Sequence, residues 1–232
     1  MRVIARLHND FPTKFGLPRQ SGLVEALESV IVFEPEFRVP EALRGLEGFS
    51  HLWLLWEFHQ ARRADWSPTV RPPRLGGNTR MGVFATRSPF RPNPIGLTCV
   101  TLKEIRPVEG LGHVLVVGGA DMMDGTPIWD IKPYLPYADC RPEARGGFAQ
   151  AQAARQLAVS FPPALLAKIA PDRREALLGA LAQDPRPAYQ HDPRRVYGFP
   201  YGAWEIRFTV AEGVLTVRAV EDAPGMLKEE NE

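Results

Sequence analysis

The first 140 residues contain no ten-residue stretch with the spacing of an amphipathic helix. Short apolar runs of strand length alternate there with turns rich in glycine and proline, which is typical of all-β barrels and sandwiches. One run, residues 50–58, is apolar on both faces and therefore indicates a central strand. The other expected strands span residues 2–7, 28–33, 82–85, 95–105, 113–117 and 127–131.

The composition changes after about residue 144, where alanine, leucine and glutamine recur at helical spacing. The last two expected strands are joined by Glu212-Gly213, a turn signal. We therefore expect a β-rich N-terminal domain, residues 1–142, and a small α+β C-terminal domain, residues 143–232. The helices of this second domain are expected at residues 149–157, 163–169 and 173–183, and its strands at 203–210 and 214–220.

Arginine side chains concentrate between residues 62 and 91. This stretch holds seven arginines and one acid, Asp65, whereas the formal net charge of the whole chain is +1. Such a local excess of guanidinium groups fits an anionic ligand or a nucleic-acid backbone. The prolines and glycines of residues 71–97 predict a shaped loop that can carry function. The plain alternative is a solvated basic loop.

Three loops carry most of the polar candidates, namely residues 18–20, 76–94 and 121–127. They combine arginines with the acids of a turn. This mixture suits a ligand that has both an anionic and a cationic group.

A second set of candidates follows the last of these loops. Asp130, Lys132, Tyr134 and Tyr137 are candidates to line a pocket that stacks a base and handles a proton. His59, at the end of the central strand, is a candidate base at the edge of that pocket, with a purely structural role as its alternative.

Other site classes find little support in the sequence. The histidines and the two cysteines show no metal-ligand spacing, so we expect no metal. The Walker A, Rossmann glycine and nucleophile-elbow patterns are absent, and a hydrolase that uses Asp121 or Asp124 ranks low. No leader or membrane-spanning run is apparent, so we expect a cytoplasmic protein with free thiols and no membrane partner.

Seven motifs extend over nearly the whole chain. They are Pro18-Arg-Gln20, Leu46-Glu-Gly-Phe-Ser-His-Leu52, Arg71-Pro-Pro-Arg-Leu-Gly-Gly-Asn78, Gly82-Val-Phe-Ala-Thr-Arg-Ser-Pro-Phe-Arg-Pro-Asn-Pro-Ile-Gly96, Asp124-Gly-Thr-Pro127, Asp130-Ile-Lys-Pro-Tyr-Leu-Pro-Tyr137 and Asp184-Pro-Arg-Pro-Ala-Tyr189. Together they closely resemble the tRNA methyltransferases that modify threonylcarbamoyladenosine.

The resemblance implies a single-sheet β-barrel, S-adenosylmethionine as methyl donor, and a homodimer. It also implies a substrate, the threonylcarbamoyladenosine beside the anticodon of tRNA, which is methylated on its exocyclic N6. The donor contacts that it implies fall on Pro18, Arg19, Gln20, His59, Gln60, Arg87, Leu97, Asp121, Met122, Met123 and Asp124.

The implied reaction is a direct displacement of the sulfonium methyl by a nitrogen that must lose its proton. Asp130, Tyr137 and His59 are the catalytic candidates for that proton, beside water, and the sequence does not choose among them. The alternative to an enzyme is a non-catalytic β-barrel module that binds RNA or senses S-adenosylmethionine. The candidates for binding the tRNA substrate are Arg71, Arg74, Arg80, Arg91, Lys132 and Tyr134, with Arg186 and Tyr189 in the C-terminal domain.

Overall fold

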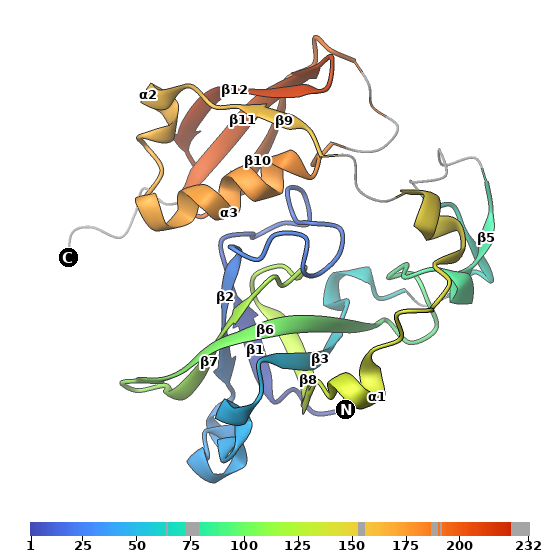
Figure 1. Ribbon diagram of the computed structural model, residues 1–232, viewed down its shortest axis with the longest axis vertical. Coiled ribbons are helices and arrows are strands. Elements are labelled where there is room, and N and C mark those ends of the chain that lie inside the picture. Colours follow the sequence, from blue (N-terminus) through green and yellow to red (C-terminus); the bar gives the residue numbers. More distant parts are fainter. Residues whose placement is uncertain (64, 73–78, 153–155, 187–189, 191, 224–232) are drawn as a thin grey trace.

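The computed structural model describes residues 1–63, 65–72, 79–152, 156–186, 190 and 192–223 (Figure 1). Strands dominate this part of the chain, and they gather in two main sheets and one small two-stranded ladder. The prediction of a mainly β protein is therefore confirmed. Among the described residues, no helix is long and apolar enough to cross a membrane.

The first sheet is a closed barrel in the order β1-β2-β7-β6-β3-β8. All its pairings are antiparallel, and because β8 pairs again with β1, each strand has a neighbour on both sides. Its strands are β1 (Ala5–His8), β2 (Glu28–Phe33), β3 (His51–Glu57), β6 (Ile95–Val108), β7 (Gly112–Gly118) and β8 (Thr126–Pro133).

The expected central strand at 50–58 is β3, which pairs with β6 and β8. Its inward side chains Leu52, Leu54 and Trp56 are buried in the barrel core. Its outward side chains His51, Trp53 and Leu55 are half-buried, so one of the two faces expected to be covered remains partly open. Opposite Trp56 lies Gly96, where an added Cβ would meet the indole ring at 2.1 Å. Only glycine leaves room for the tryptophan at this position.

The expected strand at 82–85 is wrong. Met81–Gly82 (β5) pairs with Thr69–Val70 (β4) in a two-stranded ladder, and Val83–Ala85 then forms a 3-10 turn, η6. The turn forms because the amide and hydroxyl of Thr86 both donate to the Val83 carbonyl, at 3.1 and 2.8 Å. Further short helices are η1 (Pro35–Phe37), η2 (Pro40–Leu43), η3 (Leu46–Gly48), η4 (His59–Ala61), α1 (Pro136–Asp139) and η7 (Gly147–Gln152).

The second main sheet has the order β10-β11-β12-β9, with one parallel pairing between β12 and β9. Leu177 and Leu181 of α3 are fully buried in its core. The expected Glu212-Gly213 turn is confirmed, since both residues have positive φ, 49° and 78°, as a tight hairpin requires. The elements are β9 (Ala158–Ser160), α2 (Pro163–Leu166), α3 (Pro171–Ala182), β10 (Tyr197–Tyr201), β11 (Trp204–Ala211) and β12 (Val214–Asp222).

Residues 9–27, here called the crossing segment, leave the barrel after β1 and return to it at β2. In Figure 1 this blue segment lies between the barrel and α3. Its side chains Phe11, Val24 and Leu27 are buried in the core of the second sheet rather than in the barrel. Phe11 stacks on Phe199 of β10, with 6.3 Å between ring centroids.

The crossing segment bears on the division into domains. The second core contains α3 and β10–β12, but it is completed by side chains that precede residue 142 in the chain. The boundary between 1–142 and 143–232 therefore stays a prediction.

Replacing Phe11 by alanine should destabilise the protein by about 3–5 kcal/mol, because it leaves a cavity the size of a phenyl ring in a fully buried cluster. Urea unfolding measures this loss. The matched control is Phe84→Ala, since the Phe84 side chain is 73% exposed and its truncation should change the free energy of unfolding by about 0.5 kcal/mol or less. Equal effects of the two changes would contradict the shared core.

Candidate active site

Three connections meet at one end of the barrel, here called the loop end. They are the crossing segment between β1 and β2, residues 58–94 between β3 and β6, and residues 119–125 between β7 and β8. A backbone hydrogen bond joins the first connection to the third, from Gly22 N–H to the Gly119 carbonyl at 2.9 Å, and the side chain of Arg87 joins the second to Gln20 of the first. The described residues of the three loops singled out from the sequence therefore converge at this end (Figure 1).

A carboxylate lies at the centre of the loop end. Thr98 of β6 donates its hydroxyl to Asp121 at 2.8 Å, and Trp56 in turn donates its indole N–H to Thr98 at 2.9 Å. Burial raises the pKa of the Asp121 carboxyl above its ordinary value, although the hydrogen bonds from Thr98 and from the Ser21 amide, and the charge of Arg87, act in the opposite direction. Asp121 is therefore a partly buried acid whose ionised form is stabilised by a nearby cation.

Two of the predicted arginines lie on either side of Gln20. A guanidinium nitrogen of Arg87 donates to the Gln20 side-chain carbonyl at 2.6 Å. Arg19 donates to the main-chain carbonyl of Arg186 at 2.7 Å, and the neighbouring Pro18 is buried. Arg87 and Gln20 are thus brought together, and the charge of Arg87 reaches Asp121.

The Asp121–Asp124 turn is fixed by a residue that the sequence did not single out. Asn9 donates its side-chain amide to the Met122 carbonyl at 2.8 Å, and its backbone N–H to Asp124 at 3.1 Å. The side chain of Met122 is buried in the barrel core, and the Met123 carbonyl accepts the Thr126 hydroxyl at 2.7 Å. The position of Asn9 at the end of an expected strand, before a turn, is the sequence signal that could have identified it.

The remaining donor candidates do not join this group within one chain. His59 and Gln60 lie in η4, just beyond the end of β3. Leu97 is 57% exposed, and it faces the outside of the sheet because its neighbour Thr98 faces inward. These three residues border the loop end but lie away from the described contacts of Asp121.

The catalytic candidates are also separated in one chain. Asp130 lies opposite Leu55 in the middle of the sheet and pairs with Lys132 at 2.9 Å. Tyr137 is 85% exposed in α1, beyond the opposite end of β3 from His59. The length of β3 alone separates these two ends by about 20 Å. Their common role therefore stays a prediction.

Some of the candidates for binding RNA make contacts within the chain, and others are exposed or lie outside the described residues. Arg91 donates to the Thr86 carbonyl of its own loop at 3.0 Å, and Arg80 donates to Thr69 at 3.3 Å. Tyr134 packs on the ring of Trp53, with 5.7 Å between centroids. Arg71 is exposed at the end of β4, whereas Arg74 and Tyr189 lie outside the described residues.

Arg186 already has a partner within the chain. Its guanidinium makes two hydrogen bonds of 2.8 Å to the carboxylate of Asp184, and only 11% of its side chain is exposed. This ion pair uses two of the five N–H groups of the guanidinium. Direct binding of RNA by Arg186 stays a prediction.

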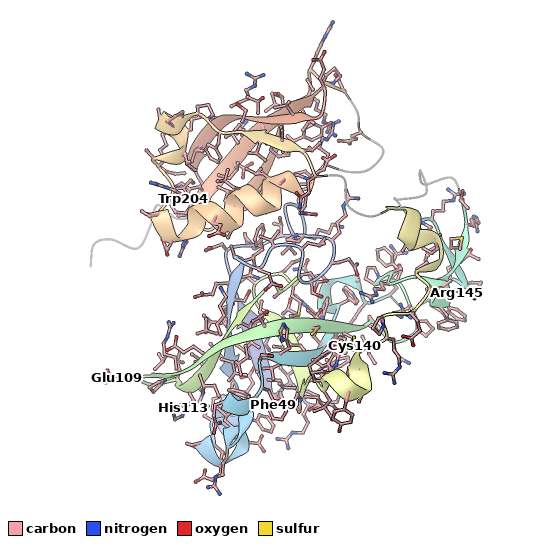
Figure 2. All side chains as sticks on the ribbon, viewed as in Figure 1. Phe49, Glu109, His113, Cys140, Arg145 and Trp204 are labelled. Atoms are coloured by element: carbon pink, nitrogen blue, oxygen red, sulfur yellow. The ribbon has the colours of Figure 1, made fainter. Side chains whose placement is uncertain are left out.

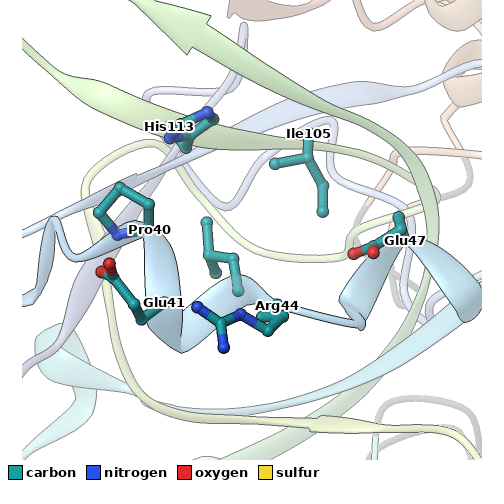
Figure 3. Close-up of a pocket in the computed structure, with 7 residues that line it drawn as sticks. Pro40, Glu41, Arg44, Glu47, Ile105 and His113 are labelled. Carbon is teal, nitrogen blue, oxygen red and sulfur yellow. The ribbon is translucent and has the colours of Figure 1, made fainter.

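An open pocket of about 410 Å³ lies at the other end of the barrel (Figure 3). It is formed by η2, η3 and the β6–β7 hairpin, where Phe49, Glu109 and His113 are also found (Figure 2). None of the predicted site residues lines it. In the described part of the chain, no three His, Cys, Asp or Glu side chains gather as metal ligands.

Comparison with known proteins gives consistent similarities. Residues 6–140 match the model of the tRNA-methyltransferase O N-terminal domain, and residues 154–223 match that of the TrmO C-terminal domain. The chain is 43% identical over 228 residues to the tRNA (adenine(37)-N6)-methyltransferase of Escherichia coli (strain K12), which covers 94% of this chain and 96% of that protein.

Other relatives agree with this match. A relative from Pseudomonas aeruginosa that carries "S-adenosylmethionine-dependent methyltransferase" in its name is 43% identical over 206 residues, or 84% of this chain and 85% of that protein. A crystal structure of TrmO from P. aeruginosa superposes with a TM-score of 0.77 at 34% identity, covering 95% of each chain.

The shifted acid at the loop end gives a pH-dependent prediction. Because the pKa of Asp121 is raised on folding, the folded state binds this proton more tightly than the unfolded state. The free energy of unfolding should therefore fall as the pH rises from the ordinary value of 3.8 through the raised pKa, and then level off. Asp121→Asn, which carries no such proton, should lack this fall.

Urea unfolding at steps from about pH 4 to about pH 7 measures the difference between variant and wild type. Thr98→Val serves as the companion variant. It removes the hydroxyl that lowers the Asp121 pKa, so the fall should extend to higher pH. Parallel curves for Asp121→Asn and the wild type would remove Asp121 as the source of the effect.

Proposed function

Because this chain belongs to the tRNA-methyltransferase O family, we propose that it transfers a methyl group from S-adenosylmethionine to N6 of the adenosine beside the anticodon of tRNA. The observation that carries this proposal is the convergence at the loop end. There the arginine fork of Arg87 and the partly buried acid Asp121 lie close enough to interact. A ligand with a carboxylate and a cationic centre matches that pair of charges.

The residues of the loop end fit the methyl donor. S-adenosylmethionine, when bound, supplies an electrophilic methyl group on a positively charged sulfur. Arg87 would hold its carboxylate, since a guanidinium forms paired hydrogen bonds with such a group. Asp121 would attract its cationic part, because a carboxylate shielded from water interacts strongly with a nearby cation.

The acceptor is proposed to be threonylcarbamoyladenosine rather than plain adenosine. The threonyl group adds a second carboxylate to the substrate. The arginines of residues 62–91, a stretch with one acid, supply positive charge for this carboxylate and for tRNA phosphates. Arg71 is exposed on that stretch, and Arg80 is exposed directly before β5. A tRNA substrate also favours a cytoplasmic location.

The proton on the acceptor nitrogen requires a base, and Asp130, Tyr137 and His59 remain the candidates. A homodimer would bring together the ends of β3 that a single chain keeps apart. In support, the outer face of β6, β3 and β8 presents exposed Leu97 and half-buried Trp53. This face combines these apolar side chains with the Asp130–Lys132 ion pair, a mixture that suits a second copy of the chain.

The first test of the proposal is transfer of labelled methyl groups to total tRNA. tRNA from cells that make threonylcarbamoyladenosine should be methylated at least about 10-fold faster than tRNA from cells that lack it, because arginines set up for a carboxylate are otherwise left without their partner. Equal rates would refute the requirement for the modification. Donor or RNA binding without any transfer would favour the non-catalytic module.

Arg87→Lys tests the donor site, since lysine keeps the charge and loses the planar fork. The change should weaken S-adenosylmethionine binding by about 1–3 kcal/mol, or about 5- to 150-fold, in calorimetry. The matched control is Arg106→Lys, whose arginine pairs with Glu104 on the distant hairpin strand. If both variants bind like the wild type, Arg87 is not a donor contact.

A further inference from the structure

The turn that follows α3 is held in one shape by its own ion pair. Asp184 adopts the left-handed conformation, with φ of 52°, and its carboxylate receives both hydrogen bonds of the Arg186 fork. Burial acts to raise the pKa of Asp184, but the hydrogen bonds and charge of Arg186 outweigh it and hold that pKa below its ordinary value. The ionised pair therefore fixes the main chain of residues 184–186.

The carbonyls of this turn face the barrel. The guanidinium of Arg19 donates to the Arg186 carbonyl at 2.7 Å and approaches that of Asp184 at 3.5 Å. Arg19 belongs to the crossing segment, so these contacts join the C-terminal sheet domain to the loop end of the barrel. The fork of Arg186 thus holds the turn, while the carbonyl of Arg186 holds Arg19.

From Arg19 the contacts continue to the loop end. The Gln20 side chain donates to the Arg19 carbonyl and accepts from Arg87 at 2.6 Å. The backbone amide of the next residue, Ser21, lies close enough to Asp121 to act on the pKa of its carboxyl, lowering it. One continuous series of contacts therefore leads from the Asp184 carboxylate to both charged groups assigned to the donor.

The barrel loops bond the main chain of the crossing segment at Phe11, whose carbonyl accepts from the Asp124 amide, and at Gly22, whose amide donates to the Gly119 carbonyl. Pro12, Thr13, Lys14 and Arg19 are exposed, and the buried anchors Phe11 and Val24 pack into the second core. A loop fixed only at its ends would sample many conformations, and ordering it at the moment of binding would lower affinity. Contacts from the C-terminal turn remove that freedom before the donor arrives.

We infer that the Asp184–Arg186 turn is a positioning element for the donor site, with Asp184 acting through Arg19 and Gln20 on Arg87. The inference rests on the proposed function, since it takes the loop end as the donor site. It gives the C-terminal domain a task in donor binding that needs no contact with the donor. Loss of the turn should raise the KM for the donor while leaving kcat at saturation nearly unchanged.

Asp184→Asn is the informative variant, because asparagine tolerates positive φ but removes the charge and replaces one of the two oxygens that accept from Arg186 with an NH2 donor. We expect S-adenosylmethionine to bind about 5- to 20-fold more weakly in calorimetry without tRNA. Hydrogen exchange should also quicken at the amides of residues 19–21 in the donor-free protein. This second readout does not depend on any assignment of function.

The matched control is Arg173→Gln, which breaks another ion pair between the two parts, Arg173 with Asp10 at 2.9 Å. If the turn merely fastens the domains together, both variants should lower stability and donor affinity alike, and the inference is overturned. It is also overturned if Asp184→Asn leaves exchange at residues 19–21 unchanged. Failure of the wild type to bind S-adenosylmethionine, with faster exchange in Asp184→Asn, would instead overturn the proposed function alone.

Discussion

The burial of the crossing segment in the second core is the interaction on which the rest of the structure depends. Phe11 and Val24 belong to the N-terminal part by sequence, yet they fill space between α3 and β10. Gly16 has a φ of 96° and lies against Phe199, where an added Cβ would meet the ring at 2.4 Å. Close packing of this kind permits one arrangement of the segment, and it therefore restricts the conformations of the loop that carries Arg19 and Gln20.

The loop end shows how a closed barrel can display polar groups without weakening its core. Trp56 fills the barrel interior, but its indole N–H is satisfied by Thr98, which passes a hydrogen bond to Asp121. The Asp121 carboxylate is thus held by Thr98, and Thr98 is held in turn by the buried indole of Trp56. The geometry that a sulfonium ligand would meet is consequently set by the apolar interior as much as by the loops.

Local patterns predicted the strands well where one chain segment decides the outcome. The β-branched run at residues 28–33 is a strand with those bounds, and Glu212-Gly213 forms its turn with both residues at positive φ, which Gly213 adopts without a steric cost. The convergence of the three polar loops could also be predicted. The role of Asp184 could not, because it depends on contacts with Arg19, a residue 165 positions away. The same holds for Phe11, since its apolar character does not reveal which of two cores it enters.

The route of the crossing segment has a consequence for synthesis on the ribosome. Phe11, Val24 and Leu27 emerge almost two hundred residues before β12 completes the sheet that buries them. At about 5–20 residues per second, translation leaves these apolar side chains without their partners for roughly 10–40 s. The barrel can close during that interval, but the loop that carries Arg19 cannot reach its folded conformation, because its anchors pack into the second core. The nascent chain therefore orders the loop end last, when the C-terminal sheet closes over residues made first.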